Sequence, residues 1–84
     1  MEEIFNADVE RKKGLCSNEI YYIAEKKIYE CLGKRVKIRY NYLGDERNFK
    51  GVITFIGYGM FDLKQERQVI KNLKISSIIK IFKE

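Results

Sequence analysis

The spacing of apolar positions changes once along the chain, and the change separates one helix from a series of strands. Between residues 17 and 32, apolar side chains recur every three to four residues, which is the spacing of one helix face. The members of this stripe are Ile20, Ile23, Ala24, Ile28, Cys31 and Leu32. Ser17 or Asn18 is suited to cap the first turn, and Gly33 is suited to end the last one. We therefore predict a helix over residues 17–32.

After Gly33 the apolar residues alternate with polar ones, as they do in a strand with one buried face. We predict strands at residues 34–40, 49–56, 60–65, 68–71 and 75–82, separated by turns at 41–48, 57–59 and 66–67. A short 3₁₀ turn at Ser76 and Ser77 would fit within the last strand. Gly51 lies early in the second strand, where a missing side chain often marks a bend or a close approach between backbones.

These elements predict a mainly β protein with one N-terminal helix. Five short antiparallel strands at even spacing favour a small SH3-like or Sm-like barrel, and closing the barrel would leave no exposed sheet edge. We expect the helix to cover one open end of that barrel. The predicted core consists of Ile20, Ile23, Ile28 and Leu32 on the helix and Val36, Ile38, Ile53, Phe55, Leu63, Ile78 and Phe82 on the strands.

The first fifteen residues follow neither period. Their apolar positions are scattered, and a basic triplet follows four acids. We predict that residues 1–15 form a flexible or weakly helical N-terminal arm and that residues 16–84 form a single domain with one core. A chain of 84 residues leaves a large share of its surface exposed, so self-association into a homo-oligomer would bury more apolar area.

The residue types that are missing narrow the chemistry. The chain has no histidine, which removes the commonest general base, and it contains no P-loop or dinucleotide-binding motif. Cys16 and Cys31 flank the predicted helix, which would hold them about 22 Å apart, too far for a disulfide. With no CxxC spacing either, a zinc site is not expected. We predict a protein that is not an enzyme and holds no metal and no other cofactor.

No apolar run approaches the roughly 20 residues that cross a bilayer. The acidic start, Met1-Glu2-Glu3, is the opposite of the basic leader of a signal peptide. We therefore expect a soluble, cytoplasmic protein with no membrane partner.

Charge is distributed unevenly around a net value of +5. Residues 1–30 hold five basic and seven acidic side chains, whereas residues 31–84 hold twelve and five. In the strand at 34–40, the cations Arg35, Lys37 and Arg39 would share one face, which would attract a polyanion such as nucleic acid. An ordinary solvated sheet face, or a lysine-rich composition inherited from an AT-rich coding sequence, would give the same pattern.

Two local patterns resemble the Sm-like superfamily, which includes the bacterial RNA chaperone Hfq and the LSm proteins. Residues 51–60, GVITFIGYGM, are similar to the family's second-strand glycine and the loop that follows it. Residues 70–78, IKNLKISSI, are similar to its Arg-Gly or Lys-His motif and its Ile-x-x-Ile ending. The chain departs from the family at Gly57, where Asp is usual, at Phe61, where Asn is usual, and at Asn72, where Gly or His is usual.

The resemblance implies RNA binding through loops and assembly into a ring. Tyr58 would stack on a base, and Lys71 and Asn72 would make polar contacts. If neither residue contacts RNA, Tyr58 would pack on its own barrel and Lys71 would lie at the solvated end of a strand. Asn72 can adopt the left-handed backbone that Gly would adopt at this position.

Two classes of function follow from these features. The first is a non-catalytic nucleic-acid-binding protein, RNA before DNA. The second is a protein-interaction or regulatory module, such as an SH3-like adaptor or a phage or mobile-element inhibitor of a host enzyme. Such a module would dock its partner through the helix face or an edge strand and would not bind nucleic acid.

Overall fold

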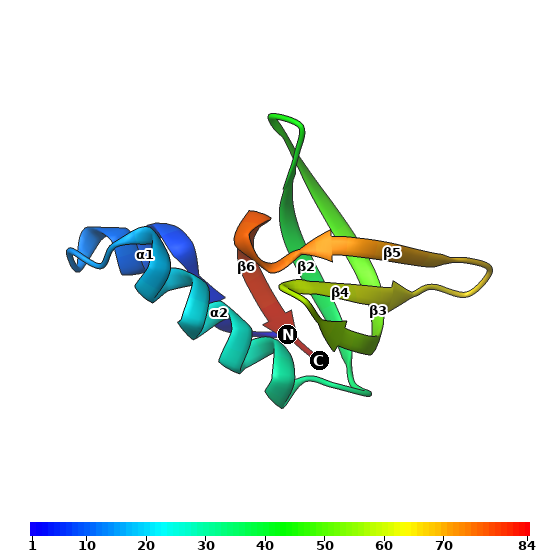
Figure 1. Cartoon of the computed structure of the whole chain (residues 1–84). Helices are drawn as coiled ribbons and strands as arrows, with labels where there is room; N and C mark the ends of the chain where they lie inside the picture. Colours follow the sequence, from blue (N-terminus) through cyan, green and yellow to red (C-terminus); the bar gives the residue numbers. More distant parts are fainter.

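The computed structural model describes all 84 residues and contains two helices and six strands. In chain order the elements are β1 (Glu2–Asn6), α1 (Ala7–Lys12), α2 (Ser17–Glu30), β2 (Arg35–Tyr42), β3 (Asp45–Gly57), β4 (Met60–Lys64), β5 (Val69–Lys74), a 3₁₀ turn (Ile75–Ser77) and β6 (Ile78–Lys83). The strands form one antiparallel sheet in the order β1-β6-β2-β3-β4-β5. Figure 1 shows that the sheet is strongly curled and that both helices lie on one side of it.

The sheet is open, which differs from the closed five-stranded barrel that we predicted. Its two edges, β1 and β5, do not pair with each other, and β1 is a sixth strand added along β6. The curl nevertheless carries β5 across β2 (Figure 1), where the Tyr40 hydroxyl accepts a hydrogen bond of 2.9 Å from the Lys74 backbone N–H. The mainly β class is confirmed, but the strand count and the closure are wrong.

Residues 1–15 contain β1 and α1 and are part of the fold, in place of the flexible or weakly helical arm that we predicted. Phe5 and Ala7 are buried in the core, and Phe5 lies opposite Ile81 of β6. The Asn6 side chain caps α1 by accepting a hydrogen bond of 3.0 Å from the Asp8 backbone N–H. Periodicity located neither element because a strand of five residues and a helix of six are too short to display a period.

The predicted long helix is confirmed as α2, which ends two residues earlier than expected, at Glu30. Its N-cap is Cys16 rather than either of the two residues that follow. The Glu19 carboxylate accepts a hydrogen bond of 3.0 Å from the Cys16 backbone N–H. Beyond the helix, Gly33 has a φ of 79°, and its N–H donates to the Ile53 carbonyl at 2.7 Å, which ties the helix end to the sheet. Neither helix is both long and apolar enough to cross a membrane.

One core fills the space between α2 and the concave face of the sheet. Its sixteen buried residues are Phe5, Ala7, Ile20, Ala24, Ile28, Cys31, Val36, Ile38, Tyr40, Ile53, Phe61, Leu63, Leu73, Ile75, Ile78 and Ile81. Most of the predicted core is among them. Ile23 and Phe82 are only half-buried, and Leu32, which lies beyond the end of α2, is exposed.

Phe55 is the main error in the predicted core, since 47% of it is exposed. A β-bulge between Ile53 and Phe55 shifts the pairing of β3 with β4. Ile53 faces Leu63 inside the core, whereas Phe55 pairs with Asp62. One extra residue in a strand reverses the sides on which all later residues lie, so simple alternation placed Phe55 on the wrong face.

The long turn predicted at residues 41–48 is also wrong. β2 and β3 stay paired as far as Tyr42 and Asp45, leaving only Leu43 and Gly44 in the turn. Both have a positive φ, 52° and 91°, as a two-residue type I′ turn requires. This hairpin projects from the rest of the molecule (Figure 1), so its strand residues need no apolar alternation.

Ile53 and Phe55 supply a direct test of this bulge. Ile53→Ala should lower the free energy of unfolding by about 2–5 kcal/mol because the side chain is fully buried. Phe55→Ala should cost about 1 kcal/mol because nearly half of the residue remains in water. Chemical denaturation of the two variants measures both values, and equal losses would contradict the bulged register.

Gly51 is required by close contact between β3 and β4. A Cβ atom at this position would collide with the backbone carbonyl oxygen of Lys64, and that strand cannot withdraw without breaking its pairing. Gly51→Ala should therefore destabilise the protein by about 1–3 kcal/mol. Asn48→Ala, in an exposed position of the same strand, is the control and should change the stability little. Thermal unfolding followed by circular dichroism compares the two, and a neutral Gly51→Ala would show that the strands can separate.

Candidate functional site

β2 turns three cations to the outer face of the sheet, which we define as the face opposite α2. The alternate residues of β2 are buried and point inward: Val36, Ile38 and Tyr40. The period of two therefore sends Arg35, Lys37 and Arg39 outward. Successive members of this triplet are roughly 6.6 Å apart along the strand, a separation similar to that of successive phosphates in an extended single strand.

Neighbouring strands add three lysines to the same face. Lys50 of β3 lies opposite Lys37, and Lys80 of β6 lies opposite Arg39. Lys64 of β4 lies opposite Val52 of β3. We call the six cations together the basic face: Arg35, Lys37, Arg39, Lys50, Lys64 and Lys80.

Only half of the basic face is paired with acids. The exposed ion pairs are Arg35–Glu84 at 3.6 Å, Arg39–Glu46 at 2.7 Å and Lys80–Glu3 at 3.8 Å. Lys37, Lys50 and Lys64 form no ion pair, and the Lys37 ammonium lies 5.3 Å from the centre of the Phe82 ring. Because exposed ion pairs contribute only about 0–1 kcal/mol, the paired cations remain able to exchange their partners for phosphates.

The turn between β4 and β5 borders one end of this face. Together with Arg35 and Lys50, residues 65–68 border a hollow of about 430 Å³ that is open to solvent and has no apolar lining residue. We call it the polar hollow. Its third cation, Arg67, was missed from the sequence, where Glu66-Arg67 indicates only a turn.

Tyr58 lies in the turn between β3 and β4 and is 93% exposed. Its φ of 55° and the φ of 72° at Gly59 again make a two-residue turn with positive φ. The Gly59 carbonyl accepts a hydrogen bond of 3.0 Å from the Ile75 backbone N–H, which anchors this turn, and the Tyr21 hydroxyl of α2 lies close to Gly59. Tyr58 therefore projects from an anchored turn and does not pack on the sheet, which leaves its ring accessible.

Lys71 and Asn72 lie at a bulge in the pairing of β4 with β5. Asn72 has a φ of 61°, the left-handed backbone expected there, and its N–H donates to the Asp62 carboxylate at 3.1 Å. Asn72 borders a second hollow, of about 220 Å³, with Tyr42 among its lining residues. Neither Tyr58 nor Lys71 lines it. The structure thus does not gather the three residues that the Sm-like resemblance implies into one pocket.

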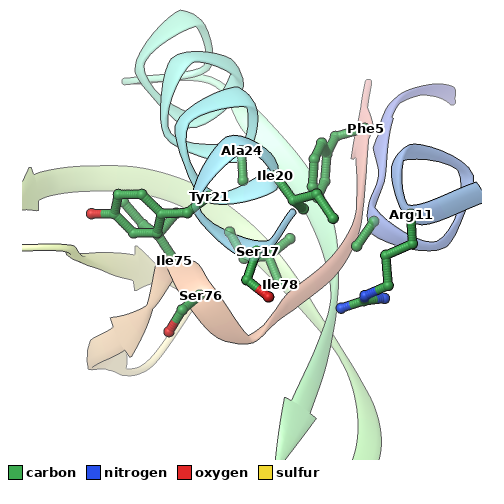
Figure 2. A pocket seen from close by; sticks show the side chains of 10 residues that line it. Phe5, Arg11, Ser17, Ile20, Tyr21, Ala24, Ile75, Ser76 and Ile78 are labelled. Atoms are coloured by element: carbon green, nitrogen blue, oxygen red, sulfur yellow. The ribbon is translucent and has the colours of Figure 1, made fainter. Parts of the chain in front are cut away.

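A third cavity lies between α1, α2 and the 3₁₀ turn (Figure 2). It is mainly apolar, with a volume of about 90 Å³, and Arg11, Ser17 and Ser76 are its polar lining residues. Small-molecule pockets usually exceed about 300 Å³. This cavity is a packing gap between the two helices, too small for a nucleotide or a cofactor.

Three side chains have shifted pKa values, and all three belong to α2 or its ends. Burial raises the pKa of the Cys31 thiol. Burial and the Glu25 carboxylate, which accepts a hydrogen bond from the Tyr21 hydroxyl at 3.2 Å, raise the pKa of Tyr21. The hydrogen bond from the Cys16 backbone lowers the pKa of Glu19. Each shift is explained by helix capping or packing, and none falls on the basic face.

The two thiols should differ sharply in reactivity. Cys16 is exposed, whereas Cys31 is fully buried and its raised pKa lowers the fraction of reactive thiolate at pH 8. An aromatic disulfide reagent should modify one thiol of the native protein rapidly and the second only on unfolding. Cys16→Ser should abolish the fast phase. Two equally fast thiols in the native protein would contradict the packing of the C-terminal end of α2 against the sheet.

Comparisons with known proteins identify no relative of this chain. No family model, no curated protein and no solved structure matches the chain. The Sm-like resemblance therefore stays a prediction from local sequence patterns, and the function has to be inferred from the arrangement of the residues themselves.

Proposed function

We propose that the protein is a non-catalytic nucleic-acid-binding protein that holds single strands, RNA before DNA, on the basic face. The observation that carries the proposal is the convergence of six cations on one side of the sheet, three of them without an acidic partner. Nucleic-acid affinity comes largely from neutralising phosphates with such cations. The preference for RNA rests on the Sm-like resemblance.

Exposed aromatic rings near the basic face favour single strands over duplexes. Phe55 lies three residues beyond Val52 on β3, and its ring covers the position that a Gly57 side chain would occupy. Tyr58 follows in the adjoining turn, beside Tyr21 of α2, and would stack only on a base that extends beyond the basic face. Unpaired bases can stack on such rings for roughly 1–3 kcal/mol each, whereas the bases of a duplex are already stacked on one another.

Absence of catalysis is part of the proposal. The groups whose pKa values are raised, Tyr21 and Cys31, are half-buried or buried among the packing contacts of α2. They therefore lie on the opposite side of the sheet from the basic face. A bound strand would meet lysine, arginine and aromatic side chains there, and the carboxylates of Glu3, Glu46 and Glu84 are engaged in exposed ion pairs with the cations of this face.

We also infer that the sheet of this protein is an open variant of the SH3-like and Sm-like barrels. The order of the strands after α2 and the strong curl support it, as does the hydrogen bond between Tyr40 and the backbone of Lys74, which links β2 to the far edge of the sheet. Both edges, β1 and β5, are free to pair with other chains, so a homo-oligomer built through them is part of this proposal.

The open edges and the exposed apolar tips also favour the second function, a protein-interaction module. Leu43, at the tip of the β2–β3 hairpin, is 90% exposed, and Tyr22 and Tyr29 are exposed on α2. A protein partner could add a strand to β5 or bind the helix face. This function predicts complexes that survive nuclease treatment and moderate salt. The nucleic-acid proposal predicts that either treatment dissociates the complexes.

Binding to short U-rich and A-rich oligonucleotides tests the main proposal. The logarithm of the association constant should fall linearly with the logarithm of salt concentration, with a slope of about −0.7 for each phosphate that is neutralised. The double variant Lys37→Gln and Lys50→Gln should weaken binding and reduce the size of the slope by about 1.4, because two phosphate contacts are removed. Fluorescence anisotropy across a salt series gives both quantities.

The matched control is Lys12→Gln with Lys26→Gln, which changes the net charge equally at exposed positions on α1 and α2. It should leave the slope unchanged within error. If both double variants reduce the slope equally, the attraction is a general effect of charge and the basic face is not the binding surface. If the unaltered protein does not bind either oligonucleotide at low salt, the proposal is rejected.

A further inference from the structure

The polar hollow differs from the rest of the basic face because its cations approach from separate segments. Arg35 comes from β2, Lys50 from β3 and Arg67 from the turn between β4 and β5. Glu66, Gln65 and Gln68 complete the lining. Three cations around one hollow, against a single lining carboxylate, leave an excess of positive charge that an anion would neutralise.

The charges in the hollow are largely uncommitted. Lys50, Glu66 and Arg67 form no ion pair, and Arg35 is held by Glu84 only through a long contact of 3.6 Å. Cations of like charge that face one hollow repel each other, and this repulsion is relieved when an anion enters. The hollow is therefore electrostatically suited to receive a negative group.

Hydrogen bonds hold the turn in place beside β3. The Gln65 backbone N–H donates to the Gln68 carbonyl at 2.8 Å, and the Gln68 side-chain amide donates to the Gln65 side-chain oxygen at 2.8 Å. The Gln65 side-chain amide in turn donates to the Lys50 carbonyl at 3.1 Å. Because these three bonds fix the turn that carries Arg67, the order gained when a ligand binds is confined to the cationic side chains.

The lining also selects the kind of anion. No apolar or aromatic side chain borders the hollow, so it offers nothing on which a base or an acyl chain could pack. Two arginines and a lysine match the geometry and charge of a phosphate, which accepts several charge-assisted hydrogen bonds at once. The volume of about 430 Å³ leaves room for the groups attached to that phosphate.

We propose that the polar hollow is a phosphate-binding site in which Arg35, Lys50 and Arg67 hold one phosphate group. The source is either a free phosphate or one phosphate of a nucleic-acid strand, and the second source rests on the proposed function. In a bound strand, this phosphate lies at the end of the β2 triplet and sets the position of the strand along the basic face.

Titration of inorganic phosphate tests the site without any nucleic acid. In amide and side-chain NMR spectra of the full chain, the resonances of Gln65, Arg67 and Gln68 should shift with phosphate. Arg67→Gln should weaken this binding about fivefold or more, because one of the three cations is lost. Glu66→Gln should strengthen it, because the only lining carboxylate is removed. Lys26→Gln, with the same charge change as Arg67→Gln on an exposed position of α2, should not alter it.

All three variants are at exposed positions, so the fold should persist, and unchanged backbone spectra away from the substitution verify this. No phosphate-dependent shift around the hollow would overturn the proposal. Equal weakening by Arg67→Gln and Lys26→Gln would overturn it as well, since the effect would then be one of net charge.

Oligonucleotide binding separates the two sources of phosphate. If the strand supplies it, Arg67→Gln should weaken oligonucleotide binding and reduce the size of the salt slope by about 0.7. If phosphate binds in the hollow but oligonucleotides bind nowhere, the site takes free phosphate. The phosphate site then stands, and only the proposed nucleic-acid-binding function is rejected. If oligonucleotides bind and Arg67→Gln changes neither their affinity nor the slope, the proposed function stands and the strand does not occupy the hollow.

Discussion

Burial of the inner side of β2 in the single core is the constraint on which the rest of the structure depends. β2 is an inner strand that pairs with both β3 and β6, and Val36 and Ile38 are fully buried. Since successive side chains of a strand point to opposite faces, burying these residues forces the intervening cations outward. The core and the basic face are therefore two sides of one strand, and the cations carry no penalty of burial because the sheet separates them from the apolar interior.

The curl of the sheet decides which residues meet. Irregularities interrupt the pairing of β1 with β6, β2 with β6, β3 with β4 and β4 with β5, and bulges of this kind bend and twist strands. The bent sheet curls over itself, with α2 on one side (Figure 1), and brings β5 close enough to β2 for Tyr40 to hydrogen-bond to the Lys74 backbone. The irregularity near Phe55 also turns its aromatic ring toward solvent, whereas regular pairing would have buried the ring in the core.

Electrostatic attraction and rigidity have different origins in this molecule. The basic face is a property of alternation along β2 and β3, and its charges are only loosely held by exposed acids. The polar hollow needs the turn at residues 65–68, which side-chain amides fix against the Lys50 backbone. In the function that we propose, the loose cations would attract a polyanion from a distance, and the fixed turn would give it one defined point of contact.

The sequence alone determined those features that repeat within a few residues. The periods of 3.6 and 2 located α2 and the strands, and the alternation in β2 placed Arg35, Lys37 and Arg39 on one face. Gly51 indicated a position where a side chain would not fit, and Asn72 indicated one where the backbone is left-handed. Each of these features is local, because a helix face, a strand face or a backbone angle is set by the residues nearest to it.

Only the tertiary structure decided the features that join distant segments. Phe5 and Ala7 enter the core because β1 pairs with β6 at the other end of the chain. The sequence of residues 1–15 contains no apolar pattern that predicts this pairing. The open edges, the exposed Phe55 and the meeting of Arg35, Lys50 and Arg67 follow from register shifts and curl. A register shift of one residue changes the face of a side chain without changing the composition around it, so periodicity alone could not reveal it.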